Sequence, residues 1–150
     1  MFEYLIHIEP RLYDRYLTVE RNIKSASNSF YDSYLDMQEQ FVKTVILAAG
    51  IDFKPNETCG ALLKKPDVVA LFSDTLGVDD YTFHKMQDYT LKVNAHKHKG
   101  EKKIAVDTIV SYLRVFYTAT AAYGKSKGIE CEEFNADEII RIFDLYDREN

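Results

Sequence analysis

The sequence predicts an all-α protein, a single helical bundle of about five main helices with shorter helices between them and a helix at the C-terminal end. Apolar residues recur three or four positions apart in nearly every segment, which is the spacing of one helix face. No segment alternates apolar and polar residues, and no Asn-Gly or Asp-Gly pair marks a hairpin turn. With 150 residues, the chain has the length of one domain and can bury a core without disulfides or metal ions.

The first helix is expected over residues 5–23, with Pro10 near its beginning or at a break, because proline lacks the N–H that a helix interior needs. Its apolar face comprises Leu5, Ile8, Leu12, Tyr16, Val19 and Ile23. The polar residues 25–29 predict a turn, in which Ser27 or Ser29 caps the second helix. The apolar face of that helix comprises Phe30, Tyr34, Met37, Phe41, Val45 and Ala48. Gly50 follows, where helices commonly end in left-handed geometry.

Shorter helices are expected in the middle of the chain. Residues 51–58 predict a loop, and Thr58 is suited to cap a short helix that ends near Leu63. Pro66 favours the first turn of the next helix. The apolar residues of that helix are Val68, Val69, Leu71, Phe72 and Leu76.

Two longer helices are expected on either side of a charged loop. Asp79 or Asp80 begins the first of them. Its inward residues are expected to be Phe83, Met86, Tyr89 and Val93. The loop covers residues 96–103, and the second helix runs from Val106 to just before Gly124. Its apolar side comprises Val106, Ile109, Val110, Leu113, Phe116, Tyr117 and Ala121.

The C-terminal part of the chain predicts one more helix. Residues 125–134 indicate a loop, after which Asn135 and Glu138 have the spacing of a capping box. The inward residues of the last helix are expected to be Ile139, Ile142, Phe143 and Tyr146. We therefore expect residues 1–124 to form the bundle, and residues 125–150 to pack on it or to lead to a further domain.

Composition limits the function and the compartment. The net charge of −5 and the pI near 5.4 exclude a protein that coats nucleic acid with its whole surface. The two cysteines are far apart and lack metal-site spacing, so two free thiols in a reducing cytoplasm are expected. No apolar run has the length of a membrane span, and the start of the chain lacks a secretory signal.

One short stretch of the chain is strongly basic. Residues 92–103, called the basic segment below, hold five lysines, two histidines and one glutamate. The segment thus has a charge of +4, which leaves −9 for the other 138 residues of a chain with net charge −5. Such a segment on an acidic body is typical of a site that meets phosphate groups. The alternative interpretation is a solvated loop.

Two histidines of the basic segment invite chemical interpretations. His96 and His98 have too few neighbouring ligands for a metal site, so neither a metal nor another cofactor is predicted. In a nuclease without metal, His98 can act as the general base while a nearby lysine stabilises the phosphate. His7 and His84 occupy helical positions typical of packing or surface residues. The carboxylates of the second helix, Asp32, Asp36 and Glu39, indicate an exposed face, with an active groove as the alternative.

The order of these elements resembles the HEPN superfamily, the higher-eukaryote and prokaryote nucleotide-binding domains. The resemblance covers about residues 1–124 and is closest to the branch at the N-terminus of type I restriction-like helicase subunits and related defence proteins. It is carried by Phe2 and Leu5, the long first helix, the turn at Ser25–Ser29 and the aromatic helix from Val106 to Tyr123.

The resemblance also covers part of the family's Arg-x4–6-His motif. Asn94 and His98 hold the spacing of its Asn and His, whereas Val93 stands at the Arg position with Lys92 beside it. In a register shifted by two, His96 takes the place of His98. Where HEPN domains are ribonucleases, the Arg and His are implied to act together on RNA, so the absence of Arg implies a non-catalytic module. The resemblance further implies a compact bundle that often pairs through its motif-bearing face, and hence a homodimer.

The leading hypothesis is a non-catalytic, cytoplasmic HEPN-like module that binds RNA, DNA or a protein partner, in a bacterial restriction, defence or mobile-element context. The residues expected to line its binding region are Lys92, Asn94, His96, Lys97, His98, Lys99, Lys102 and Lys103. One alternative is a metal-independent ribonuclease that uses His98 with Asn94. The other is an assembly domain that dimerises through Tyr112, Phe116 and Tyr117, although simple core packing is the favoured interpretation of these rings.

Overall fold

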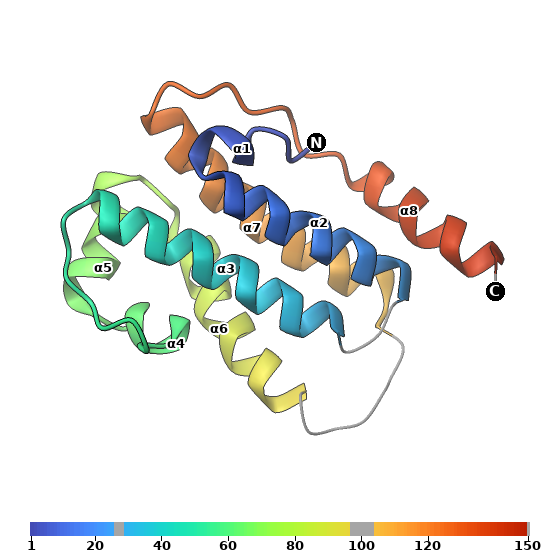
Figure 1. Ribbon diagram of the computed structural model, residues 1–150, viewed down its shortest axis with the longest axis horizontal. Coiled ribbons are helices and arrows are strands. Elements are labelled where there is room, and N and C mark those ends of the chain that lie inside the picture. Colours follow the sequence, from blue (N-terminus) through green and yellow to red (C-terminus); the bar gives the residue numbers. More distant parts are fainter. Residues whose placement is uncertain (26–28, 97–103, 150) are drawn as a thin grey trace.

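The computed structural model describes residues 1–25, 29–96 and 104–149, and within them every regular element is helical, which confirms the predicted all-α class (Figure 1). The elements are α1 (Leu5–Ile8), α2 (Pro10–Ser25), α3 (Ser29–Ala48), α4 (Cys59–Leu62), α5 (Pro66–Ala70), the π-helix η1 (Leu71–Thr75), α6 (Asp80–His96), α7 (Val106–Ser126) and α8 (Ala136–Glu149). No described helix is both long and apolar enough to cross a membrane.

Three long helices form the body of the bundle. Helices α2 and α3 pack against each other along their lengths, and α7 packs on α3 behind them (Figure 1). Helix α6 crosses α3 and α7, while α8 packs on α2 and α7 at the opposite side of the bundle. The short elements α4, α5 and η1 join the end of α3 to the beginning of α6. One continuous apolar core runs through all of these layers.

The expected first helix is two helices, with the break at Pro10 that the sequence allowed. Glu9 has extended backbone geometry, with φ −163° and ψ 118°, and α2 begins at the next residue. Proline suits this first helical position because its missing N–H has no partner to lose there. Leu5, Leu12 and Ile23 of the predicted apolar face are buried.

A second departure from the predicted helices lies between Pro66 and Leu76, where one helix was expected. Helix α5 ends after five residues and the chain widens into the π-helix η1, in which the N–H of Leu76 donates to the carbonyl of Leu71 at 3.0 Å. Gly77, with φ of 68°, then turns the chain in left-handed geometry. The wide turn keeps Phe72 fully buried while the chain changes direction.

Three predicted helix caps are present, although the capping box of Asn135 and Glu138 forms only in part, because the N–H of Asn135 donates to Sδ of Met1. The Thr58 side chain accepts from the N–H of Ala61 at 3.2 Å, and the Asn135 side chain accepts from the N–H of Glu138 at 3.3 Å. At the beginning of α6, the Asp79 carboxylate accepts from the N–H of Thr82 at 2.9 Å. Each bond satisfies one of the N–H groups that a helix beginning leaves free.

The prediction that the helix from Val106 ends just before Gly124 is wrong. Helix α7 continues to Ser126, and the left-handed glycine after it is Gly128, with φ of 74°. Gly124 is required for a different reason, because a Cβ there would lie 2.9 Å from Sγ of Cys131 in the following loop. The loop between α7 and α8 therefore packs directly on the helix backbone.

Aromatic rings dominate the core between α3, α6 and α7. Tyr112 and Phe116 are 3% and 1% exposed, so the favoured core-packing interpretation of these two rings is confirmed. The alternative of an assembly domain stays a prediction. Tyr117 is half-buried and its ring meets Phe134 of the loop before α8. Along the last helix Ile139 is buried, and Ile142 and Phe143 pack partly against the core.

We expect Gly124→Ala to lower the free energy of unfolding by about 1–3 kcal/mol, because the new methyl group would overlap Cys131. In a Cys131→Ala background, the sulfur that the new methyl group would overlap is absent. There, the helix propensity of alanine over glycine, about 1 kcal/mol, should make Gly124→Ala neutral or stabilising. Urea unfolding of the four chains measures both effects, and equal costs in the two backgrounds would contradict the overlap.

Candidate functional site

The two helices that flank the basic segment, α6 and α7, meet at one end of the bundle (Figure 1). Helix α6 ends and α7 begins at this end, and the end of α2 and the beginning of α3 lie there too. Lys92, Asn94 and His96 belong to the last turns of α6, although their side chains lie outside the described part of the structure. The other predicted binding residues also lie outside the described residues, namely Lys97, His98, Lys99, Lys102 and Lys103.

The opposite end of the bundle, where α7 ends, has a pocket with several carboxylates in its lining. The pocket has a volume of about 560 Å³ and lies where the loop after α7 passes α1. Its lining residues are Glu3, Tyr4, His7, Gly128, Ile129, Glu130 and Glu132. Three of these residues carry carboxylates, and those of Glu3 and Glu132 form ion pairs with the Met1 ammonium, which lies 3.6 Å from the Glu132 carboxylate. Charge is thus distributed unevenly along the bundle, with the basic segment at one end of α7 and this pocket at the other.

A second hollow, called the α6–α7 groove below, runs between the two helices that flank the basic segment. It has a volume of about 250 Å³. Its lining residues are Asp79, Tyr81, Thr82, Tyr89, Ser111, Arg114, Val115 and Thr118. Thr82 and Tyr89 are buried and form the floor, whereas Tyr81 is 68% exposed. The groove therefore combines a buried floor with an exposed aromatic ring.

Charged groups of both signs surround this groove. The Lys85 ammonium lies 5.6 Å from the centre of the Tyr81 ring, and the Arg114 guanidinium lies 4.7 Å from the centre of the Phe134 ring. The carboxylate of Asp79 accepts from the N–H and from the hydroxyl of Thr82, at 2.9 and 2.7 Å. These two hydrogen bonds lower the pKa of Asp79, so the group is ionised at neutral pH.

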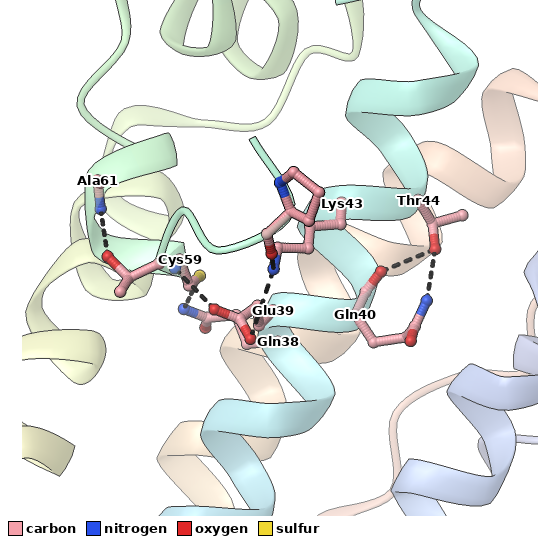
Figure 2. Close-up of polar contacts among 9 residues, drawn as sticks. Gln38, Glu39, Gln40, Lys43, Thr44, Cys59 and Ala61 are labelled. Atoms are coloured by element: carbon pink, nitrogen blue, oxygen red, sulfur yellow. Dashed lines mark hydrogen bonds and ion pairs between the residues drawn. The ribbon is translucent and has the colours of Figure 1, made fainter. Parts of the chain in front are cut away.

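Buried polar contacts fix the position of α6 against α3 and α4. The side-chain nitrogen of Gln38 donates to the carbonyl of Met86 at 3.1 Å and to the hydroxyl of Thr90 at 2.9 Å. It also lies 3.7 Å from Sγ of Cys59 (Figure 2). The Gln38 side-chain oxygen is buried and has no hydrogen-bond partner among the described residues.

The carboxylates of α3 do not gather in a groove. Asp32 and Asp36 are exposed, as the exposed-face interpretation predicted. Glu39 instead accepts from the N–H of Cys59 at 2.9 Å and lies 3.8 Å from the Lys43 ammonium (Figure 2). Glu39 thereby satisfies a backbone N–H at the beginning of α4. The two residues are twenty positions apart, so helical spacing does not reveal this contact.

The remaining predicted groups lie on the surface or in the core. His7 and His84 are exposed, and the ring of His84 is hydrogen-bonded to the carbonyl of Asp80 at 2.7 Å. Cys59 and Cys131 are free thiols, as expected. Among the described residues, no group of three or more His, Cys, Asp or Glu side chains is placed to hold a metal ion.

Comparison of the chain with models of protein families, with curated proteins and with solved structures finds no match. The HEPN resemblance and the homodimer therefore stay predictions. Sequence reasoning did not single out Tyr81 or Arg114. The available signal was a large ring on the polar side of α6, opposite the inward face that contains Phe83 and Met86.

We expect Gln38→Glu to destabilise the protein by about 2–3 kcal/mol at pH 7, because a buried carboxylate loses its hydration and cannot donate to the Met86 carbonyl. Burial raises the folded-state pKa of such a carboxyl above its unfolded value of about 4.3, so the deficit should grow as the pH rises through that range.

Gln38→Met is the matched control, since Thr90 still donates to Met86 at 3.0 Å and the unsatisfied oxygen is removed. We expect it to change stability by less than about 1 kcal/mol. Urea unfolding at several pH values compares the two variants. Equal stability of both at pH 7 would show that this position tolerates a buried charge.

We expect Cys131, which is half-buried, to react with a thiol reagent in the native protein, and Cys59 to react only after unfolding. Burial raises the pKa of the Cys59 thiol to about 11, so about one part in a thousand is thiolate at pH 8. Mass spectrometry after iodoacetamide treatment, with and without urea, identifies the modified residue. Native modification of Cys59 at the rate of Cys131 would contradict the packing around Gln38.

Proposed function

We propose that the chain is a non-catalytic module that binds nucleic acid. In this proposal the basic segment contacts the phosphates of the nucleic-acid backbone. The observation that carries the proposal is the separation of charge: +4 within twelve residues and −9 over the rest of the chain. A basic region limited to one end of an acidic molecule lets phosphate bind there while the remaining surface repels it.

The described geometry supports this proposal in two ways. Helices α6 and α7 bring the two ends of the basic segment to the same end of the bundle (Figure 1). The acidic pocket lined by Glu3, Glu130 and Glu132 lies at the far end of α7. A nucleic acid is therefore drawn to one end of the molecule, and its orientation on the surface follows from the charge.

The proposal leaves out catalysis because of Val93. Where the resemblance implies an Arg that acts with His98, this chain has an apolar residue. When members of a catalytic set act as a unit, the loss of one removes most of the rate. Binding without cleavage is therefore the expected outcome with RNA, and a cleaved probe would favour the ribonuclease instead.

We expect Lys97→Glu with Lys99→Glu to weaken binding of single-stranded RNA and of duplex DNA at least tenfold at low salt, because two phosphate contacts are replaced by repulsion. The salt dependence, as the slope of log K against log salt, should become shallower by roughly two. Fluorescence anisotropy at low and moderate salt measures both quantities, and a denaturing gel checks the probe for cleavage.

The matched control is Lys64→Glu with Lys125→Glu, which makes the same charge change at two exposed positions away from the basic segment. We expect it to weaken binding far less. If the two double variants lose affinity equally, net charge rather than the basic segment explains binding. If no nucleic acid binds at either salt, the proposal fails and a protein partner becomes the better explanation.

A further inference from the structure

We infer that the α6–α7 groove holds one unpaired base of a bound strand, which makes a single-stranded nucleic acid the preferred ligand. The inference rests on the proposed function, because the groove alone is too small to hold a strand. It adds a second contact, made by described residues, to the phosphate contacts of the basic segment.

Tyr81 supplies the stacking surface. It is the most exposed large hydrophobic side chain among the described residues, at 68%, although aromatic rings in this protein are otherwise mostly buried. Proteins that bind single strands present aromatic rings of this kind, because every base has a flat face that can stack on them. The Lys85 ammonium, 5.6 Å from the ring centre, places a positive charge beside the same platform.

The groove favours a base over a phosphate. Asp79 lines it and is ionised at neutral pH, so a phosphate there would be repelled. A base instead offers amino groups that can donate to the Asp79 carboxylate. Arg114 lines the same groove, with its guanidinium 4.7 Å from the centre of the Phe134 ring. The volume of about 250 Å³ lies just below the roughly 300–1,000 Å³ of sites for larger ligands, as expected for a single base.

The groove also lies in the right place along α6. Tyr89, at one end of it, precedes Lys92 by three residues, which is about 4.5 Å along a helix. Tyr81, at the other end, lies about 16 Å from Lys92 by the same measure. A strand of a few nucleotides therefore spans both the platform and the basic segment. In a duplex the bases are paired and stacked, so none is available to enter the groove.

The test compares Tyr81→Ala with Tyr81→Phe, each on a twelve-nucleotide single-stranded DNA carrying one 2-aminopurine and on a duplex of the same sequence. We expect Tyr81→Ala to weaken single-strand binding about tenfold and to leave duplex binding unchanged. Tyr81→Phe keeps the ring and should bind like the parent chain. Binding by the parent chain should quench 2-aminopurine fluorescence in the single strand, because stacking quenches it, and Tyr81→Ala should abolish this quenching.

The exposed position of Tyr81 makes misfolding of these variants easy to exclude, by circular dichroism and urea unfolding. If Tyr81→Ala binds the single strand as tightly as the parent chain, or weakens duplex binding equally, the inference fails. The proposed function still stands in that case, provided Lys97→Glu with Lys99→Glu reduces binding of both probes. If the parent chain binds neither probe, both proposals fail.

Discussion

The arrangement of the bundle depends on the packing of three tyrosines from three helices. The rings of Tyr89 from α6 and Tyr112 from α7 are stacked, with centres 3.7 Å apart, and Tyr34 from α3 meets both edge-on. The Tyr34 hydroxyl donates to the carbonyl of Tyr112 at 3.1 Å, so this buried polar group is satisfied. Because the rings are large and their geometry is specific, the contact fixes both the spacing and the rotation of the three helices.

Two consequences for the surface follow from this packing. Tyr89 forms part of the floor of the α6–α7 groove, so the same ring that joins the helices also shapes the hollow between them. Helices α6 and α7 run in opposite directions, which brings the ends of the basic segment together and separates them from the acidic loop after α7. For the proposed ligand, an anionic strand, this arrangement would give the long-range attraction a defined direction and so raise the rate of productive encounter.

Much of the fold follows from the sequence, because helix faces and helix ends are local. Residues three or four apart define the buried side of every long helix. Thr58 and Asn135 mark helix beginnings through hydrogen bonds to residues three positions on, and Pro66 marks one because it needs no partner for a backbone N–H. Gly124 misled the prediction for a physical reason. Its lack of a side chain serves a contact with Cys131, seven positions away, and not a left-handed turn.

The candidate site was predictable only in part. The charge of the basic segment is a property of composition, whereas the α6–α7 groove brings together Tyr81 and Arg114, which are thirty-three positions apart. Such a pairing depends on how α6 crosses α7, and helical periodicity within either helix contains no information about that angle. Glu39 illustrates the same limit, since its contact with the beginning of α4 depends on the path of the intervening loop.

The π-helix η1 has a consequence for the comparison of this chain with others. A wide turn of this kind holds one residue more than the α-helical turn it replaces. The π-helix between Leu71 and Thr75 thus accommodates one residue more than an ordinary α-helical turn would. A chain with the same fold but an ordinary helix here is expected to be one residue shorter at this point. An alignment of the two chains should therefore allow a single-residue gap at η1, so that the residues of α6 stay in register.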